Sequence, residues 1–355
     1  MSQSMDFTRT GIPKIGAVVR GKSPVTCISY HSDGVHLYVT SEGDGRMRLV
    51  DCKRGVSDAP ALKFETEGVK LVESTHHNQC VLYTGRGGST SHSVNYLSLY
   101  DNKILRHFKG HMAEVTDVSM NPVDDCFLTA SEDRTVRLWN VQQSGALATM
   151  NLPKSTSATG NMTLDPFGLP HVTYDTTGLV FGVTAPMANS GGHLIHLYDA
   201  RKYDGGAFAE LKLETSAIQK ALEVKGISPN IANVLSKAGW KSIQFNASGK
   251  NLLITAEKGL ALMLDGFDGS VSNVFVAEGP NANTSPTLAI SACFTPDERA
   301  VLGGNEDGTI SCWDAKTGVL LRKLDGHVGP VGCVAANPKF AQIASSCTNT
   351  ALWLW

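Results

Sequence analysis

Three side chains in one part of the sequence are of the types that serine hydrolases use. His111, Ser131 and Asp133 could form a set in which the histidine removes the proton of an attacking hydroxyl. Such chemistry also needs an oxyanion site and an open pocket, and the sequence has no Gly-x-Ser-x-Gly turn. We therefore favour a structural role, in which these residues and Trp139 join one hydrogen-bonded network that satisfies buried polar groups.

Copies of the same pattern elsewhere in the chain support the structural role. Asn305 and Cys347 stand at the Ser131 position, and Asn349 stands at the Asp133 position. A stabilising network tolerates such replacements, whereas a catalytic set does not. We predict that the protein is not an enzyme, that it has no catalytic residue, and that the structural network comprises His111, Ser131, Asp133, Trp139, His327, Asp307 and Trp313.

Cofactor and metal chemistry finds no support in the remaining motifs. The eleven histidines show neither a His-x-x-x-His spacing nor a histidine and carboxylate pattern, so we expect no metal. The glycine cluster at 85–88 lacks the Lys-Ser/Thr of a phosphate loop and the spacing of a dinucleotide site. We expect no cofactor.

Charge and composition restrict the partners. Lys and Arg number 31 and Asp and Glu 33, for a net charge of -2, so we expect no direct sequence-specific binding of nucleic acid. The apolar runs fall short of the roughly 20 residues that span a bilayer, and the N-terminal residues show no secretory signal. Eight cysteines without a Cys-x-x-Cys pair suit a reducing compartment.

An internal repeat organises the chain. Residues 110–140 run from Gly-His to Leu-Trp-Asn, and the same pattern returns without a gap 216 residues later, ending at Trp355. A second gap-free copy, 174 residues later, ends at Asp314. Weaker copies follow the same pattern, and the third strands of all units are predicted to end at 51, 101, 140, 199, 265, 314 and 355. Seven units of short β-branched strands with Gly-His and Trp-Asp signatures predict an all-β, seven-bladed WD-repeat β-propeller.

The two ends of the chain are predicted to complete one blade together. The last unit stops after its third strand, and residues 15–20 resemble the strand that precedes the first unit. We expect this N-terminal strand to pair with the C-terminal blade and close the ring, because pairing removes two exposed edges. The predicted organisation is a flexible segment at 1–14 and a single propeller at 15–355.

Two insertions interrupt the repeat. Residues 153–170 are rich in Ser, Thr, Gly and Pro and are predicted to be a surface loop. Residues 214–239 are predicted to be helical, with Ser228 as N-cap, Pro229 as the first helical residue and Gly239 as C-cap. This insertion could dock a partner or pack back onto its own blade, and we favour the second.

A propeller without an active-site constellation is usually a rigid platform whose loops hold other proteins. The loops at one end of the blades supply the candidate partner-binding residues, which are Lys22, Arg46, Arg86, His92, Lys109, Arg134 and Lys258. Arg46, Arg86 and Arg134 could form a clamp for phosphate or carboxylate. An ordinary solvated rim of alternating charge explains the same residues equally well.

Several segments match a known pattern, and they are Asn95–Lys103, Ser119–Asp125, Phe294–Asp297 and Asn337–Phe340. Of these, Ser119–Asp125 and Asn337–Phe340 are more specific than the repeat requires. With these segments the chain, over roughly residues 15–355, resembles the WD-repeat protein shared by COMPASS-type histone lysine methyltransferases and by a phosphatase-containing transcription-termination assembly. The insertion at 214–239 and the loop at 85–92 exceed that pattern.

The resemblance implies a non-catalytic scaffold in the nucleus, a monomeric subunit of a hetero-complex. It implies as partners a methyltransferase subunit, a type-one phosphatase with its targeting subunit, and the C-terminal tail of transcribing RNA polymerase II, with roles in transcription regulation and termination. The alternative is a generic WD-repeat receptor, such as a ubiquitin-ligase substrate adaptor or a ribosome-assembly factor.

Overall fold

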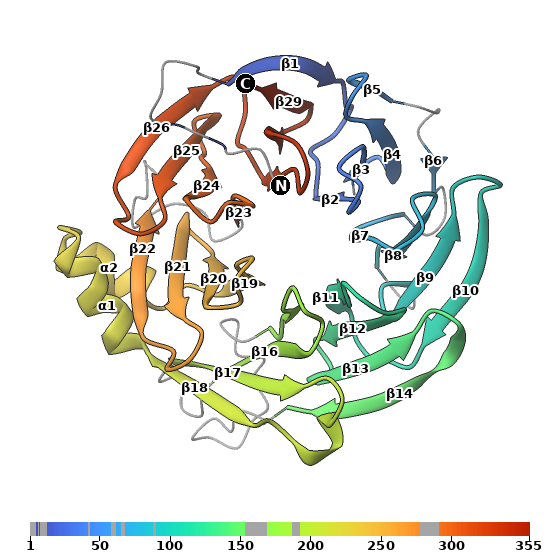
Figure 1. Cartoon of the computed structure of the whole chain (residues 1–355), viewed down its shortest axis with the longest axis horizontal. Coiled ribbons are helices and arrows are strands. Elements are labelled where there is room, and N and C mark those ends of the chain that lie inside the picture. The colour runs from blue at the N-terminus through green and yellow to red at the C-terminus, as the bar shows by residue number, and fades with distance from the viewer. Residues whose placement is uncertain are drawn as a thin grey trace. The chain divides into compact units, whose positions relative to one another are not determined.

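The computed structural model describes residues 5, 7, 13–41, 43–57, 62–64, 68–87, 90–152, 169–186, 192–276 and 291–355. Over these ranges the strands form seven antiparallel sheets, six of four strands and one of five (Figure 1). The sheets are the blades of a seven-bladed β-propeller, which confirms the predicted fold. Among the described residues, no helix is long and apolar enough to cross a membrane.

The chain divides into two compact units, which we describe separately. Unit 1 comprises Met1–Gly110, Ala277–Gly279 and Ile290–Trp355, and unit 2 comprises His111–Val276 and Pro280–Ala289. Unit 1 holds the first, second, sixth and seventh blades. Unit 2 holds the third, fourth and fifth blades together with both α-helices.

The blades of unit 1 have the following bounds. The first blade contains β2 (Cys27–Tyr30), β3 (His36–Ser41), β4 (Arg46–Asp51), β5 (Val56–Ser57) and β6 (Leu62–Lys63). The second contains β7 (Val72–Ser74), β8 (Cys80–Thr84), β9 (Ser93–Ser98) and β10 (Lys103–Lys109). The sixth contains β23 (Ala292–Phe294), β24 (Ala300–Gly304), β25 (Thr309–Asp314) and β26 (Leu320–Asp325). The seventh contains β27 (Cys333–Ala336), β28 (Gln342–Ser346), β29 (Thr350–Leu354) and β1 (Lys14–Val19).

The blades of unit 2 follow the same plan. The third blade contains β11 (Val115–Met120), β12 (Cys126–Ser131), β13 (Thr135–Asn140) and β14 (Gln143–Asn151). The fourth contains β15 (Val172–Tyr174), β16 (Val180–Pro186), β17 (Gly192–Asp199) and β18 (Ala209–Glu214), with a short 3-10 helix at Tyr203–Gly205. The fifth contains β19 (Trp240–Phe245), β20 (Asn251–Ala256), β21 (Leu260–Asp265) and β22 (Val271–Val276). The helices are α1 (Thr215–Val224) and α2 (Pro229–Leu235).

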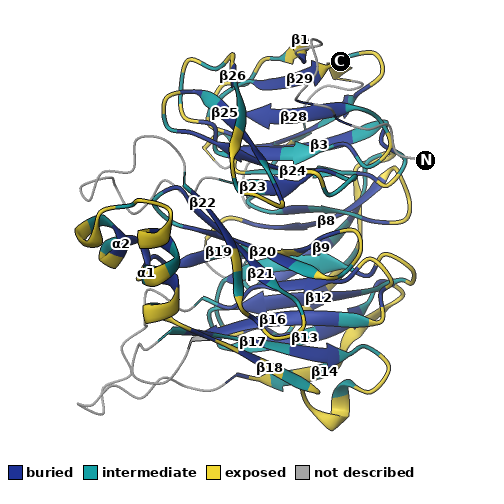
Figure 2. Cartoon of the chain, turned by 60° about the vertical axis from the view of Figure 1, so that its left-hand side comes forward, coloured by how far each residue is buried: buried dark blue, intermediate teal, exposed yellow. Residues whose placement is uncertain are grey.

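Burial within a blade depends on strand position. In the third blade, the second strand β12 is buried along nearly its whole length, whereas the outermost strand β14 is mostly exposed. A strand covered on both faces needs apolar or small side chains at consecutive positions, which explains the run Phe127-Leu128-Thr129-Ala130. Figure 2 shows these buried inner strands in dark blue and the exposed outer turns in yellow.

The N-terminal strand completes the seventh blade, as predicted. β1 pairs with β29 in antiparallel register from Lys14 opposite Leu354 to Val19 opposite Thr350, and Figure 1 shows the blue and red strands side by side. Of the predicted flexible segment 1–14, residues 5, 7, 13 and 14 are described and the rest lies outside the described residues. Phe7 is buried, and its ring meets that of Trp355 edge to face at 5.1 Å.

The insertion at 214–239 forms both helices of the chain's described part. α2 starts as predicted, with Ser228 at the N-cap position and Pro229 first, but its C-cap is Ser236, so the prediction of Gly239 was wrong. The backbone N–H of Ser236 bonds to the carbonyl of Ala232, which already completes the last turn. Ile218 and Leu222 of α1 are buried in one core with strands of the fourth and fifth blades.

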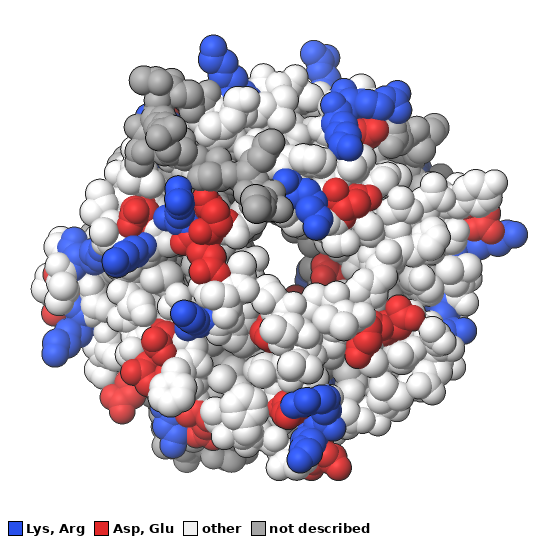
Figure 3. Space-filling view, viewed as in Figure 1, with Lys and Arg blue, Asp and Glu red and all other residues white. Residues whose placement is uncertain are grey.

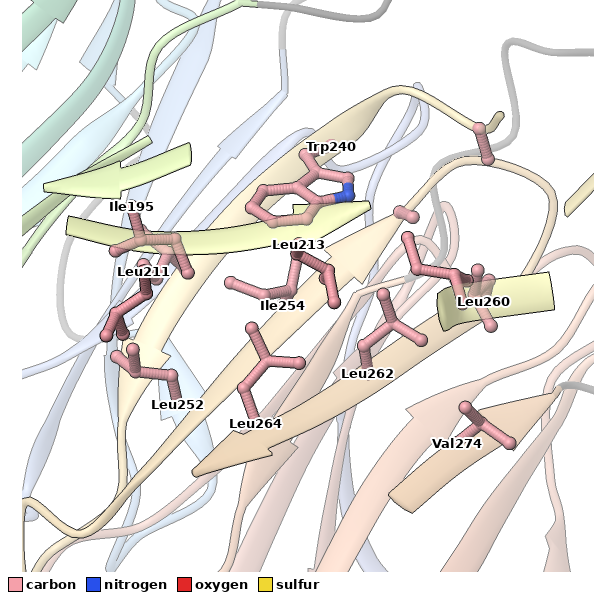
Figure 4. Packing of buried hydrophobic residues seen from close by; sticks show 14 of the residues in the cluster. Ile195, Leu211, Leu213, Trp240, Leu252, Ile254, Leu260, Leu262, Leu264 and Val274 are labelled. Atoms are coloured by element: carbon pink, nitrogen blue, oxygen red, sulfur yellow. The ribbon is translucent and has the colours of Figure 1, made fainter. Parts of the chain in front are cut away.

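The packing of the insertion agrees with the interpretation that we favoured. Figure 4 shows Leu211, Leu213 and Trp240 in the same cluster as Leu252, Ile254 and Leu262 of the fifth blade. Leu235 and Ala238 of the insertion belong to that cluster too, so the insertion packs back onto its own blades, as we favoured. The predicted loop at 153–170 lies outside the described residues except for its last two positions.

Two predicted strand ends were wrong, because β29 ends at Leu354 instead of 355 and β9 ends earlier than predicted. β9 ends at Ser98, three residues before the predicted end at 101. Ser98 pairs with Lys103, so the intervening residues form the turn to β10, with Asn102 in the left-handed region at φ 57° and Tyr100 84% exposed. Leu99 still packs, partly buried, against the core beside it, whereas Tyr100 belongs to the exposed part of the turn.

Candidate functional site

The buried polar network of the third blade centres on a hydroxyl that the sequence analysis missed. The Nε2 atom of His111 lies 2.7 Å from Oγ1 of Thr129, and the indole N–H of Trp139 donates to the same oxygen at 2.9 Å. Thr129 is fully buried. One threonine on β12 therefore connects the loop before β11 to the indole on β13.

Asp133 fixes the other side of the imidazole. Its Oδ2 lies 3.0 Å from Nδ1 of His111 and accepts the backbone N–H of Met112 at 2.9 Å, and its Oδ1 accepts the Thr135 hydroxyl at 2.7 Å. Burial raises the pKa of Asp133, but the hydrogen bonds from His111, Thr135 and Met112 outweigh it and hold that pKa well below its usual value. The carboxylate is thus charged and fully engaged.

Ser131 takes a different place from the one predicted. Its hydroxyl donates to the carbonyl of Ala113 at 3.1 Å and accepts the backbone N–H of Asp133 at 3.2 Å. The side chain is fully buried, and the imidazole nitrogen that a nucleophile would need faces Thr129. This arrangement holds the turn between β12 and β13 and does not form a serine-histidine pair.

A signal for Thr129 was present in the repeat. Residues two apart on a strand share a face, so Thr129 and Ser131 were equal candidates. The copy 216 residues later keeps a hydroxyl at the Thr129 position, as Ser345, and replaces the Ser131 position by Cys347. The retained hydroxyl identifies the position that the network needs.

The seventh blade repeats the network with changed members. Nε2 of His327 lies 2.6 Å from Oγ of Ser345, which also accepts the indole N–H of Trp353 at 2.7 Å, and Nδ1 lies 3.2 Å from Sγ of Cys347. Burial lowers the pKa of His327. Ile343 pairs with Trp353 as Phe127 pairs with Trp139, so Trp353 and not Trp355 is the counterpart of Trp139, and the predicted gap-free register was wrong after β28. The turn between β28 and β29 is shorter than that between β12 and β13, and its Asn349, which was predicted at the Asp133 position, accepts the backbone N–H of Gly21 at 3.0 Å and so ties the β1–β2 loop to this blade.

In the sixth blade the two predicted network residues, Asp307 and Trp313, make contacts that differ from those of the third blade. Gly303 stands at the Thr129 position, and a Cβ there would lie 2.7 Å from the ring of Trp313, so the indole packs on backbone. The position of His111 is Ser285, which lies outside the described residues. Asp307 accepts the hydroxyl of Thr309 at 2.7 Å and closes the β24–β25 turn.

A histidine and carboxylate cluster in the first blade escaped the sequence analysis. Nδ1 of His36 and Nδ1 of His31 lie 2.6 Å and 3.0 Å from the same oxygen of Asp33, a His-x-Asp-x-x-His spacing. The other Asp33 oxygen accepts the backbone N–H groups of Val35 and His36. Burial raises the pKa of Asp33, and these bonds together with His36 lower it to about 2. The cluster has the donor types of a metal site, while its hydrogen bonds hold the β2–β3 turn.

The predicted partner-binding residues of unit 1 lie at matching strand ends. Lys22 lies between β1 and β2, Arg46 begins β4, Arg86 and His92 lie between β8 and β9, and Lys109 ends β10. In antiparallel sheets these positions fall at the same end of each blade. Lys22, Arg86 and Lys109 are exposed, and Arg46 and His92 are half-buried.

Two of these arginines lie in one part of unit 1. A Cβ on Gly45 would lie 3.6 Å from Cα of Gly68, and a Cβ on Gly68 would lie 2.8 Å from Cβ of Arg86. Gly68 therefore lies next to both Arg86 and the residue that precedes Arg46. Nε of Arg46 is 3.6 Å from Asp44, which balances part of its charge.

Arg134 and Lys258 belong to unit 2 and occupy equivalent turns. Each follows the second strand of its blade and has a left-handed backbone, with φ 61° in both cases. Arg134 directly precedes the third strand of its blade, where the first, fifth and sixth blades have Gly45, Gly259 and Gly308, and Lys258 lies one residue earlier in its turn. Figure 3 shows basic and acidic side chains interspersed on the drawn face, so the charge pattern alone selects neither a clamp nor an ordinary rim.

Comparison with known proteins assigns the family. The profile "WD domain, G-beta repeat" matches residues 14–51, 102–140, 281–314 and 318–355. The chain is 32% identical over 331 residues to WD repeat-containing protein 82 of Drosophila melanogaster, covering 93% of this chain and 90% of that protein. The chain belongs to the family of WD repeat-containing protein 82. The family is the one that the sequence resembles.

Two further relatives are similar to the chain over most of its length. Protein ANTHESIS POMOTING FACTOR 1 of Arabidopsis thaliana is 31% identical, over 91% of this chain and 86% of that protein. COMPASS component SWD2 of Saccharomyces cerevisiae is 29% identical, over 91% of this chain and 88% of that protein. The likeness therefore covers most of each chain and not single repeats.

Proposed function

We propose that the protein is a non-catalytic WD-repeat subunit of a COMPASS-type histone methyltransferase complex in the nucleus. The observation that carries the proposal is similarity over more than nine-tenths of the chain to WD repeat-containing protein 82 and to a protein named as a COMPASS component. The polar network of the third blade supports the non-catalytic role, because His111, Thr129 and Asp133 hydrogen-bond to one another within the blade. Such rigid blades suit the display of loops to protein partners.

The finer part of the proposal concerns a second assembly. We infer that the protein also links a type-one phosphatase and its targeting subunit to the C-terminal tail of transcribing RNA polymerase II, in transcription regulation and termination. Arginine binds phosphate through paired N–H donors, and Arg46 and Arg86 lie in one part of unit 1.

Affinity purification of the tagged protein from nuclear extract, followed by mass spectrometry, tests both parts. The variant carries Arg46→Ala, Arg86→Ala and Arg134→Ala. A matched control carries Arg54→Ala, Arg201→Ala and Arg299→Ala, which remove the same charge from the opposite strand ends. We expect methyltransferase subunits with all three proteins, and polymerase with the intact protein and the control only.

Two results would contradict the proposal in different ways. Loss of polymerase from the control as well as from the variant would assign the effect to charge in general and remove the clamp. Absence of every methyltransferase, phosphatase and polymerase subunit would leave the family fold with another task, such as a generic WD-repeat receptor in ubiquitin ligation or ribosome assembly.

A further inference from the structure

The helical insertion creates a groove on unit 2. A cavity of about 480 Å³ lies between β18, α1 and β22. β18 and β22 are the outermost strands of the fourth and fifth blades, and α1 contacts both. Figure 2 shows α1 beside β22, with its outer surface exposed. A volume of this size is in the range of pockets that bury most of the surface of a drug-sized ligand.

The charge of the groove is basic. Three lysines line it, and they are Lys212 on β18 and Lys220 and Lys225 on and after α1, against a single lining carboxylate, Asp268. Lys212 pairs with Glu210 at 3.2 Å, and Asp268 accepts the backbone N–H of Ser270 at 2.8 Å. Basic side chains also predominate at the left rim in Figure 3, over α1 and α2. The groove thus complements a negative ligand.

The floor and rim of the groove are apolar. Ala217 and Ala221 of α1 and Val271 and Val274 of β22 line it. Val224, at the end of α1, also lines it and is 80% exposed, although Ile218 and Leu222 of the same helix are buried. Because the core already holds α1 through those two residues, Val224 is not needed for packing and offers an apolar contact to a ligand.

We propose that this groove binds an extended acidic segment of a partner protein. Carboxylates of the segment contact Lys212, Lys220 and Lys225, and an apolar side chain covers Val224. An acidic segment with one apolar anchor matches both the charge and the exposed apolar surface, whereas a nucleic acid matches the charge alone. The inference goes beyond the proposed function and holds whichever complex contains the protein.

Fluorescence anisotropy on the purified full-length chain tests the inference. The probe is a short fluorescein-labelled peptide of glutamate and aspartate with interspersed leucines. The variant carries Lys220→Glu and Lys225→Glu, and a matched control carries Lys202→Glu and Lys250→Glu, also exposed lysines of unit 2 but outside the groove. Thermal unfolding verifies that both variants fold, and a Val224→Asp variant tests the apolar contact separately.

We expect the groove variant to weaken peptide binding at least about tenfold and the control to weaken it less than about twofold, because the charge change is equal and only its place differs. Val224→Asp weakens binding as well, and added salt weakens it for the intact protein. Equal binding by groove variant and control overturns the inference. So does tighter binding of a single-stranded RNA of the same charge, or no peptide binding by the intact chain at about 1 mM. None of these results depends on which nuclear complex contains the protein.

Discussion

The imidazole of His111 faces the hydroxyl of Thr129 at 2.7 Å, two positions before the serine that the repeat suggested. The residues that resembled a hydrolase set therefore have a structural role, and they connect the loop before β11 to β12 and β13. The contact between His111 and Thr129 also determines which hydroxyl of β12 matters for stability.

Thr129→Val is expected to destabilise the protein by about 3 kcal/mol, because the buried nitrogens of His111 and Trp139 both lose their partner. Ser131→Ala is expected to cost about 1–2 kcal/mol, since it removes the bond to the carbonyl of Ala113 and the bond from the backbone N–H of Asp133. Urea unfolding compares the two. A larger loss for Ser131→Ala would show that the network is assigned to the wrong hydroxyl.

Acid is expected to unfold the protein partly through two aspartates. Asp133 and Asp33 both have lowered pKa values, that of Asp33 being about 2. Their folded pKa values are below the unfolded value of about 3.9, so their stabilisation is present above about pH 4 and is lost as the pH falls toward the folded value. The midpoint of urea unfolding, measured at several pH values from about 4 down to about 2, follows this loss of stability. Asp33→Asn is expected to flatten the curve, and an unchanged slope would contradict the assignment.

A buried histidine makes stability sensitive to milder acid. His193 stacks on Trp240 with ring centroids 3.9 Å apart, and burial lowers the pKa of this histidine to about 3. The folded state favours the neutral ring, so the contribution of His193 to stability is complete above about pH 6.5 and declines as the pH falls toward about 3. Within that range the equilibrium constant for unfolding rises by up to about tenfold per pH unit. His193→Phe keeps a stacking ring and should remove this slope. Unfolding curves at several pH values that show the same slope in both proteins would exclude His193 as the source.

Removing residues 1–19 is expected to expose the edge of β29. β1 pairs with β29 along its length, and Asn349 holds the loop after β1 through Gly21. An uncovered edge strand favours association between chains, so we expect a lower thermal midpoint and dimers or larger species in light scattering. Removing residues 1–4 is the control and should leave both measurements unchanged. A monomeric, equally stable protein without β1 would contradict the closure.

Lys258→Gly is expected to raise stability by about 1 kcal/mol. Lys258 has φ 61°, a conformation that costs a side chain more than it costs glycine. Lys250→Gly, at an exposed turn position whose φ is not positive, is the matched control and should lower stability by roughly 0.5–1 kcal/mol. Chemical unfolding of both variants checks the opposite signs.

The sequence predicted the repeating fold well because each blade has its own short-range signal. The third strand of the third, fourth, fifth and sixth blades ends where the Trp-Asn, Tyr-Asp, Leu-Asp and Trp-Asp pairs place it. β9 ended early because the turn to β10 contains an apolar pair. The pairing of β1 with β29 was predictable since the last unit lacked one strand.

The site was harder to predict because its contacts join distant positions. Thr129 and Ser131 share a strand face, and only the three-dimensional position of His111 selects between them. The meeting of His31, Asp33 and His36 in the β2–β3 turn depends on side-chain directions that a spacing does not give. The groove beside α1 depends on how the insertion packs against two blades.

The most direct test of the central claim is a methyl-transfer assay on the native assembly. The tagged protein is purified from nuclear extract and assayed for transfer of labelled methyl groups to histones, beside the same chain purified alone. The account predicts transfer by the assembly and none by the isolated chain. Transfer by the chain alone would contradict its non-catalytic role, and an inactive assembly without a methyltransferase subunit would contradict its membership of a COMPASS-type complex.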